Sequence, residues 1–166
     1  RFRASSLSAR FLQGENCSQG EVAPMPALVL LRTGSNGGYA FGNNCGLRWV
    51  LRFPQIEYAW ILNNDTVIEP GSVDALLHHA DGHSGAGAIG STLLDMAGGS
   101  VQCAGGFRYF PGIAVMRALG KGCKIDDLPG AADQDRWRLD YIYGAAMLLR
   151  LAAVRRVGLL DESYFL

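Results

Sequence analysis

An apolar run that ends abruptly in polar side chains sets the strongest limit on how this chain folds. Residues 60–62, Trp-Ile-Leu, are followed at once by Asn63, Asn64 and Asp65, and soon after by Glu69-Pro70-Gly71. A buried strand with a carboxylate at its end is typical of α/β enzymes, in which ligands bind beside the strand ends. Oxygen ligands of this kind suit Mg²⁺ or Mn²⁺. An ordinary Asn/Asp turn after a strand is the alternative that these residues leave open.

The composition indicates one globular domain. The 166 residues are 49% apolar and 18% charged, which is not the composition of a disordered chain. Its 15 basic and 15 acidic residues cancel, so nothing favours a nucleic-acid surface. The four cysteines form no Cys-x-x-Cys pair, which argues against a zinc ribbon and favours free thiols in a reducing cytoplasm. No apolar run reaches the ~18 residues of a membrane-spanning helix.

Apolar runs separated by Gly and Pro predict alternating strands and helices. We expect strands at residues 27–32, 58–63, 86–94, 101–109, 137–141 and 145–149, and helices at residues 4–11, 41–53, 70–81 and 151–157. This alternation favours an α/β layer architecture with a largely parallel sheet. The remaining stretch, residues 110–135, is rich in Gly and Pro and is predicted to be a long loop, functional or mobile.

Two patterns that suggest ligand sites are rejected on their context. Residues 85–90, Gly-Ala-Gly-Ala-Ile-Gly, fit the dinucleotide pattern G-x-G-x-x-G, but this pattern is informative only between a strand and the helix that it opens. Here the pattern follows a predicted helix and enters a predicted strand. His78, His79 and His83 lie near the end of the same helix, where exposed histidines are favoured electrostatically, so a metal cluster is the weaker interpretation.

Two further segments each allow a ligand site or plain packing. The glycines of residues 36–46 let the backbone approach another group and place amides at a helix start, which favours anions. A strand-to-helix turn with small residues for packing explains the same pattern. In residues 143–146, Tyr-Gly-Ala-Ala, the small side chains leave room beside a pocket, although core packing accounts for them equally well.

Taken together, these segments resemble glycosyltransferase family 2, especially its bacterial rhamnosyltransferase-like members. The matching pieces, in order, are residues 36–46, residues 62–66 with Glu69-Pro70, residues 101–106, residues 140–150 and residues 157–165. The match covers residues 28–166, whereas residues 1–27 match weakly. The resemblance implies a GT-A fold, a Rossmann-like three-layer α/β sandwich, present here as one partial domain over residues 1–166.

The resemblance also implies a donor site, residue by residue. Asn63, Asn64 and Asp65 stand where the family has its D-x-D-like motif, so Asp65 would hold Mg²⁺ or Mn²⁺ on the diphosphate of a nucleotide sugar. Asn63 replaces the first carboxylate of that motif. The glycine-rich segment would lie along the nucleotide sugar, through Asn36, Gly37, Gly38, Ala40, Asn43 and Asn44. The small-residue segment would separate the donor sugar from the acceptor, through Tyr143, Gly144, Ala145 and Ala146.

The activity implied is an inverting transfer of a sugar to a glycan or lipid-linked acceptor in cell-surface polysaccharide synthesis. The family's general base is an Asp shortly after the Tyr-Phe-Leu segment, which here ends the chain at Leu166, and Asp161 matches a structural acid instead. The first strands of the family have no match before Leu28, so we expect an inactive fragment of a longer protein that works in the cytoplasm, at the inner face of the membrane. A non-catalytic module that binds nucleotide sugars is the alternative, and an unrelated Rossmann-like nucleotide binder is a third.

Overall fold

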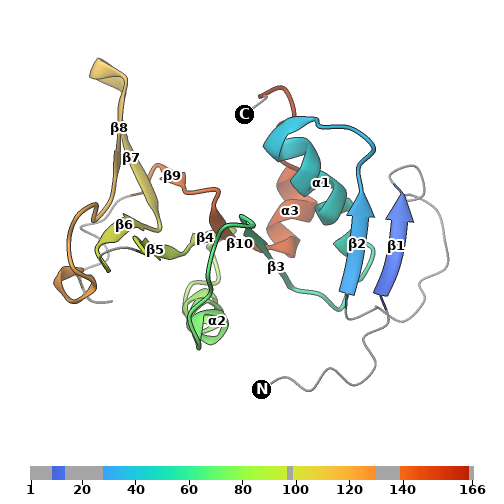
Figure 1. Ribbon diagram of the computed structural model, residues 1–166, viewed down its shortest axis with the longest axis horizontal. Helices are drawn as coiled ribbons and strands as arrows, with labels where there is room; N and C mark the ends of the chain where they lie inside the picture. The colour runs from blue at the N-terminus through green and yellow to red at the C-terminus, as the bar shows by residue number, and fades with distance from the viewer. Residues whose placement is uncertain (1–8, 14–27, 97–98, 130–138, 165–166) are drawn as a thin grey trace. The chain divides into compact units, whose positions relative to one another are not determined.

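The computed structural model describes residues 9–13, 28–96, 99–129 and 139–164. They fall into two compact units (Figure 1): unit 1 comprises residues 1–59 and 151–166, and unit 2 comprises residues 60–150. Helices and strands occur in both units, which is consistent with the predicted α/β class. Within the described ranges, no helix has the length and hydropathy needed to cross a membrane.

Unit 1 begins with a parallel pair of strands. Strand β1 (Ala9–Gln13) pairs with β2 (Leu28–Arg32), so that Ala9 lies opposite Leu28 and Gln13 opposite Arg32. The predicted helix over residues 4–11 is therefore wrong from Ala9 onward, because pairing with β2 overrides a weak local preference for helix. Its first part, residues 4–8, lies outside the described residues.

The helices of unit 1 supply its core. Helix α1 (Gly38–Val50) begins ahead of the predicted residue 41, and α3 (Leu151–Val157) matches its prediction. The early start of α1 depends on glycine at position 37, because a Cβ there would overlap the Phe41 ring. The buried apolar side chains of this unit are Ala40, Leu47, Phe53, Leu151 and Val154.

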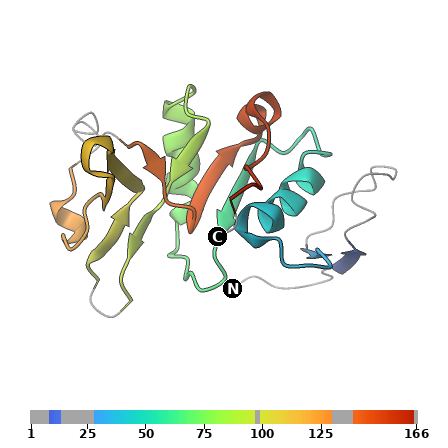
Figure 2. The same ribbon diagram turned by 90° about the horizontal axis from the view of Figure 1, so that it is seen from above.

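Unit 2 is organised around a three-stranded sheet of order β3-β10-β4, in which β10 (Ala146–Arg150) is the middle strand (Figure 2). Strand β3 (Tyr58–Leu62) enters from unit 1, and β4 (Ala88–Gly90) runs antiparallel to β10. Helix α2 (Ser72–Gly82) is fixed to this sheet by the Arg150 guanidinium, which donates to the Ala80 carbonyl at 2.8 Å.

The rest of unit 2 consists of antiparallel strands. They are β5 (Thr92–Leu94) paired with β6 (Val101–Ala104), and β7 (Gly106–Phe110) paired with both β8 (Val115–Ala118) and β9 (Tyr141–Ile142). The expectation of a largely parallel sheet is thus wrong for unit 2: the short connections of β5–β6 and β7–β8 permit only antiparallel pairing, and β10 and β9 also meet their partners β4 and β7 antiparallel. The predicted loop over residues 110–135 contains β8 and two 3₁₀ turns, at Pro111–Ile113 and Ile125–Asp127, although residues 130–138 lie outside the description.

Close backbone contact explains why two predicted strands are each divided. The runs 86–94 and 101–109 break at Ser91 and Gly105, where a Cβ on Gly90 would overlap the Gly105 carbonyl. Residues 85–90 do follow helix α2 and enter strand β4, so the rejection of the dinucleotide pattern on its context is confirmed.

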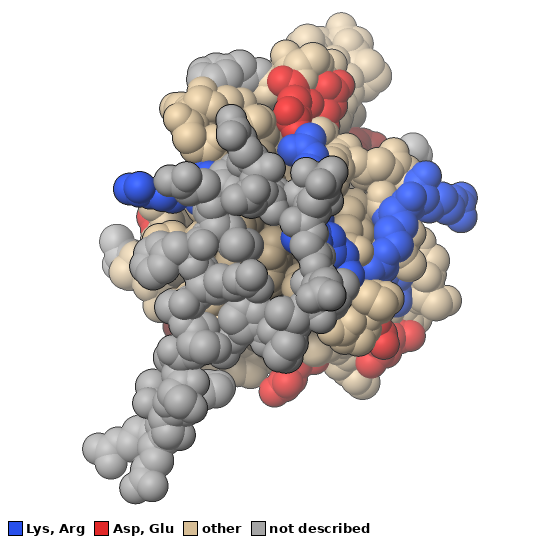
Figure 3. Space-filling view, turned by 90° about the vertical axis from the view of Figure 1, so that its right-hand side faces the viewer, with Lys and Arg blue, Asp and Glu red and all other residues tan. Residues whose placement is uncertain are grey.

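Charged side chains on the surface are mixed in sign. Figure 3 shows separate basic and acidic groups among the described residues of one face rather than a field of one sign. This mixture agrees with the net charge of zero for the whole chain.

Candidate functional site

Strand β3 ends where the sequence places the candidate ligands. After Leu62 the chain turns through Asn63, Asn64 and Asp65, and the Thr66 amide closes the turn by donating to the Asn63 carbonyl at 3.2 Å. All three polar side chains of the turn are exposed. The Asp65 carboxylate is therefore outside the hydrophobic interior and accessible to a ligand, although its binding role stays a prediction.

The turn after β3 lies beside the small-residue segment that precedes β10. The Asn63 amide donates to the Ala145 carbonyl at 2.9 Å, which joins two predicted site segments that are far apart in the sequence. Both segments belong to unit 2. Ala146 is 2% exposed and is part of the hydrophobic core. Gly144 and Ala145 are half-buried, so they are the small residues of this segment that a ligand beside the turn could meet.

Tyr143 is held by packing rather than pointing freely into solvent. Its ring meets the Phe107 ring edge-on, with ring centres 5.2 Å apart. Its backbone amide donates to the Gly105 carbonyl at 3.2 Å. The side chain is half-buried.

Ser91 is a polar residue in this area that sequence reasoning did not select. Its amide donates to the Ala146 carbonyl at 3.0 Å and its carbonyl accepts from Gly105 at 3.2 Å, so its backbone bridges two segments. The buried Ser91 hydroxyl and the buried Trp60 indole nitrogen have no hydrogen-bond partner within the described part of the chain. The signal for Ser91 was the polar pair Ser91-Thr92 inside the otherwise apolar run of residues 86–94.

The glycine-rich segment lies in unit 1, at the start of α1. The Asn36 side chain is exposed and its carbonyl oxygen accepts the Gly38 amide at 3.1 Å. Gly38 has φ 83°, a conformation that favours glycine, and the first turn of α1 carries no acidic side chain. Helix-start amides of this kind favour an anion, although the helix starts three residues before the predicted position.

Other residues of this segment have structural roles. Ala40 is buried, and the half-buried Asn43 side chain donates to the Tyr39 carbonyl at 2.9 Å. Burial also raises the pKa of the Tyr39 hydroxyl. Of the segment's predicted contacts, Asn36, Gly37 and Gly38 are therefore the ones placed at the open end of α1.

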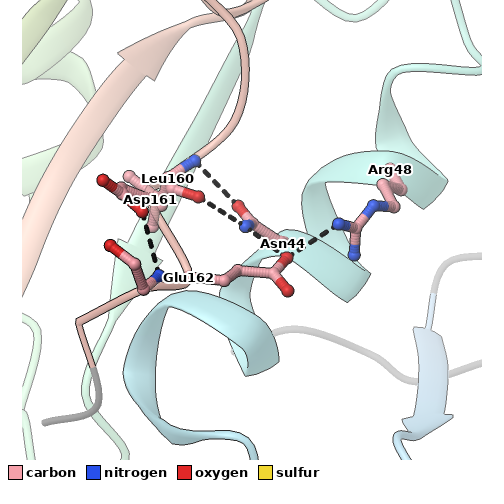
Figure 4. Close-up of polar contacts among 6 residues, drawn as sticks. Asn44, Arg48, Leu160, Asp161 and Glu162 are labelled. Carbon is pink, nitrogen blue, oxygen red and sulfur yellow. Dashed lines mark hydrogen bonds and ion pairs between the residues drawn. The ribbon is translucent and has the colours of Figure 1, made fainter.

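Asn44 is 1% exposed and fastens α1 to the chain after α3 (Figure 4). Its amide nitrogen donates to the Leu160 carbonyl at 2.8 Å and to the Glu162 carboxylate at 2.7 Å. Its oxygen accepts the Leu160 amide at 3.0 Å. Both amide hydrogens are thus used inside the protein, so Asn44 holds the fold together in this structure and offers no donor to a nucleotide.

The acids near the end of the described chain are also engaged. Arg48 forms an ion pair with Glu162 at 2.7 Å, and the hydrogen bonds from Asn44 and Arg48 lower the pKa of Glu162. The Ser163 amide donates to Asp161 at 2.9 Å and lowers the pKa of that carboxyl. Asp161 therefore stabilises a turn, as expected of a structural acid.

The turn after β3 suits a hard divalent cation that is shared with phosphate. Mg²⁺ commonly takes one or two carboxylates and completes its shell with water and substrate phosphates. Asn63, Asn64 and Asp65 offer exposed oxygens of this kind. Within the described ranges, no three His, Cys, Asp or Glu side chains gather into a metal site, so an ion here would depend on the phosphates as well.

Similarity to known proteins points to one class of enzyme. N-acetylglucosaminyl-diphospho-decaprenol L-rhamnosyltransferases from two strains of Mycobacterium tuberculosis are 29% identical over 168 residues, which covers 89% of this chain and 52% of those proteins. A low-salt glycan biosynthesis hexosyltransferase from Haloferax volcanii is 25% identical over 163 residues, covering 95% of this chain and 50% of that protein. No protein-family model and no solved structure matches. The chain spans about half the length of these curated relatives, and the similarities support a glycosyltransferase family for it.

Proposed function

We propose that this chain is part of an inverting glycosyltransferase that moves a sugar from a nucleotide-diphosphate donor to a glycan or lipid-linked acceptor. Within the glycosyltransferases, we infer a GT-A fold of family 2 and its rhamnosyltransferase-like subgroup. The relatives support the class of reaction, since their names describe the transfer of rhamnose or a hexose. The chain covers about half the length of those proteins, so we also propose, rather than infer from the similarity, the activity of a whole protein that contains it.

The observation that carries the proposal is the exposed Asp65 carboxylate at the end of β3, in a turn bonded to Ala145. A sugar diphosphate needs oxygen ligands for a cation at one end and space for a pyranose ring at the other. The turn supplies the oxygens, and the small side chains of Gly144 and Ala145 supply the space. Both features lie within unit 2 and do not depend on any other part of the chain.

Each predicted residue then has a defined task. Asp65, with Asn63 and Asn64, would hold Mg²⁺ or Mn²⁺, which when bound supplies positive charge beside the departing diphosphate. In unit 1, Asn36 and Gly37 stay predicted contacts of the nucleotide, whereas the Gly38 amide already donates to the Asn36 side chain. Asp161 and Glu162 are already bonded within unit 1, so we assign neither of them as the general base.

Calorimetric titration with nucleoside diphosphates, with and without Mn²⁺, tests the donor site. We expect binding that is tighter with Mn²⁺, and we expect Asp65→Ala to remove that gain. Asp81→Ala, which removes an exposed carboxylate on α2, is the matched control and should bind as the native chain does. Metal-dependent binding that survives Asp65→Ala would contradict the assignment.

A turnover assay with nucleotide sugars separates the enzyme from a non-catalytic binding module. Asp161 and Glu162 each accept a hydrogen bond within the protein, so we expect neither to act as the general base and we expect no sugar transfer by the chain alone. We therefore expect metal-dependent binding without transfer from residues 1–166, and transfer from a longer protein that supplies the base. A longer protein that binds the nucleotide but never transfers sugar would indicate a binding module.

A further inference from the structure

We propose that the β7–β8 hairpin of unit 2 is an anchor that inserts its tip into the surface of an anionic phospholipid bilayer. This inference goes beyond the proposed function and does not depend on it. Its basis is a turn whose side chains are apolar and exposed, at the end of a hairpin that carries a pair of opposed arginines.

The side chains at the hairpin tip are apolar, which is unusual for a turn that is exposed to water. Turns between strands are normally made of Gly, Pro, Asn, Asp and Ser, and of these the tip has only Pro111 and Gly112. Residues 110–116 read Phe-Pro-Gly-Ile-Ala-Val-Met, without a single polar side chain. Ile113 is 72% exposed and Met116 is 60% exposed, and Phe110 and Val115 are exposed as well.

The tip is a defined structure that extends past its neighbouring strand. Strand β9 pairs with β7 only at Gly106 and Phe107, so the outer half of β7 is paired with β8 alone. Residues 111–113 form a 3₁₀ turn, and Ala114 has φ 51°, a costly conformation for a residue other than glycine. This turn forms the end of the β7–β8 hairpin (Figure 1).

The charges on the hairpin fit an anionic surface. Arg108 and Arg117 lie directly opposite each other on β7 and β8, and like charges in this position destabilise a hairpin unless an anion relieves them. The hairpin, residues 106–118, contains no acidic residue. Asp140, on the neighbouring segment, accepts the Tyr109 amide at 2.8 Å and is a carboxylate that lines the cavity beside Arg108.

The spacing of charge and apolar side chains matches the depth of a bilayer interface. Arg108 and Phe110 lie on the same side of β7, and the guanidinium carbon stands 5.3 Å from the centre of the Phe110 ring. The Arg108 guanidinium and the Phe110 ring would therefore lie together at headgroup level, while the turn at residues 111–114 enters the acyl boundary. A cavity of about 440 Å³ lined by Arg108, Tyr109, Pro111, Asp140 and Tyr141 adjoins the tip and could receive a headgroup.

Vesicle sedimentation of the 166-residue chain tests the proposal. We expect binding to vesicles of phosphatidylglycerol and phosphatidylcholine, and little binding to phosphatidylcholine alone. Ile113→Asp with Met116→Asp should weaken binding about tenfold or more, and Arg108→Gln with Arg117→Gln should weaken it and reduce its salt dependence. Met96→Asp, at an 86% exposed methionine outside the hairpin, is the control and should change nothing.

Fluorescence gives a second readout that does not rely on the acidic variants. Ile113→Trp should show a blue-shifted emission with anionic vesicles and none with phosphatidylcholine. The absence of a shift, or equal binding by the tip variant and the Met96 control, would overturn the proposal. Self-association that the tip variant abolishes, without any binding to vesicles, would also overturn it and assign the tip to a second copy of the chain.

Discussion

At the scale of single residues, Asn44 shows how one buried amide can join distant parts of the chain. Its partners, Leu160 and Glu162, are 116 and 118 residues away. Asn44→Ala would leave the half-buried Leu160 amide and carbonyl without this partner. We expect it to lower the free energy of unfolding by about 3 kcal/mol, measured by urea denaturation.

Asn43→Ala is the matched control for this prediction. Asn43 is half-buried on the same helix and makes a local bond to the Tyr39 carbonyl. Its loss should cost about 1 kcal/mol or less, because water can replace that bond. Equal costs at the two positions would mean that the contacts of Asn44 do not stabilise unit 1.

Asp65 and Asn44 show what the sequence can and cannot reveal about single residues. The position of Asp65 was predictable, because an apolar strand and the turn that follows it are local features. The role of Asn44 was not predictable, since an asparagine in a glycine-rich segment looks the same whether it meets a ligand or a carbonyl more than 100 residues away. Ser91 was missed for a similar reason, since its backbone partners come from other strands.

At the scale of elements, the contact between Gly90 and Gly105 determines how the strands of unit 2 meet. A Cβ at Gly90 would overlap the backbone carbonyl of Gly105, which cannot move without displacing β7. We expect Gly90→Ala to destabilise the chain by about 3 kcal/mol or more, measured as a shift of the urea midpoint. Gly85→Ala, where a Cβ meets open space, should change stability by about 0.5 kcal/mol or less, and a similar cost at both sites would contradict the prediction.

Elements specified by local sequence were predictable, whereas strands specified by a distant partner were not. Helices α2 and α3 and strands β2, β3 and β10 follow from apolar periodicity and from Pro and Gly breakers. Strand β1 was mistaken for helix because its partner β2 decides its conformation, and β8 was hidden in a Gly- and Pro-rich stretch. Both errors concern strands whose hydrogen bonds come from elsewhere in the chain.

At the scale of the whole molecule, the α/β class was predictable but the sheet pairing was not. The alternation of strands and helices is recorded in local sequence, whereas the direction of a strand depends on which neighbour it meets. Chain order also does not reveal that unit 1 is built from two separate segments. Residues 1–59 and 151–166 belong to it, and residues 60–150 between them belong to unit 2. The contact of Asn44 and Arg48 with Glu162 joins the two separated parts of that unit.

That contact should make the stability of the whole chain depend on acid pH. The pKa of Glu162 is lowered in the folded state by hydrogen bonds from Asn44 and Arg48, so its contribution is complete above the unfolded value of about 4.3 and is lost as the pH falls through the lower folded value. Glu162→Gln keeps an oxygen acceptor but cannot titrate. We expect urea midpoints measured from neutral to acid pH to fall less steeply in this variant, with the part due to Asp161 retained. Asp81→Asn, at an exposed position on α2, should follow the native curve, and a native-like slope in Glu162→Gln would show that this carboxylate does not link folding to pH.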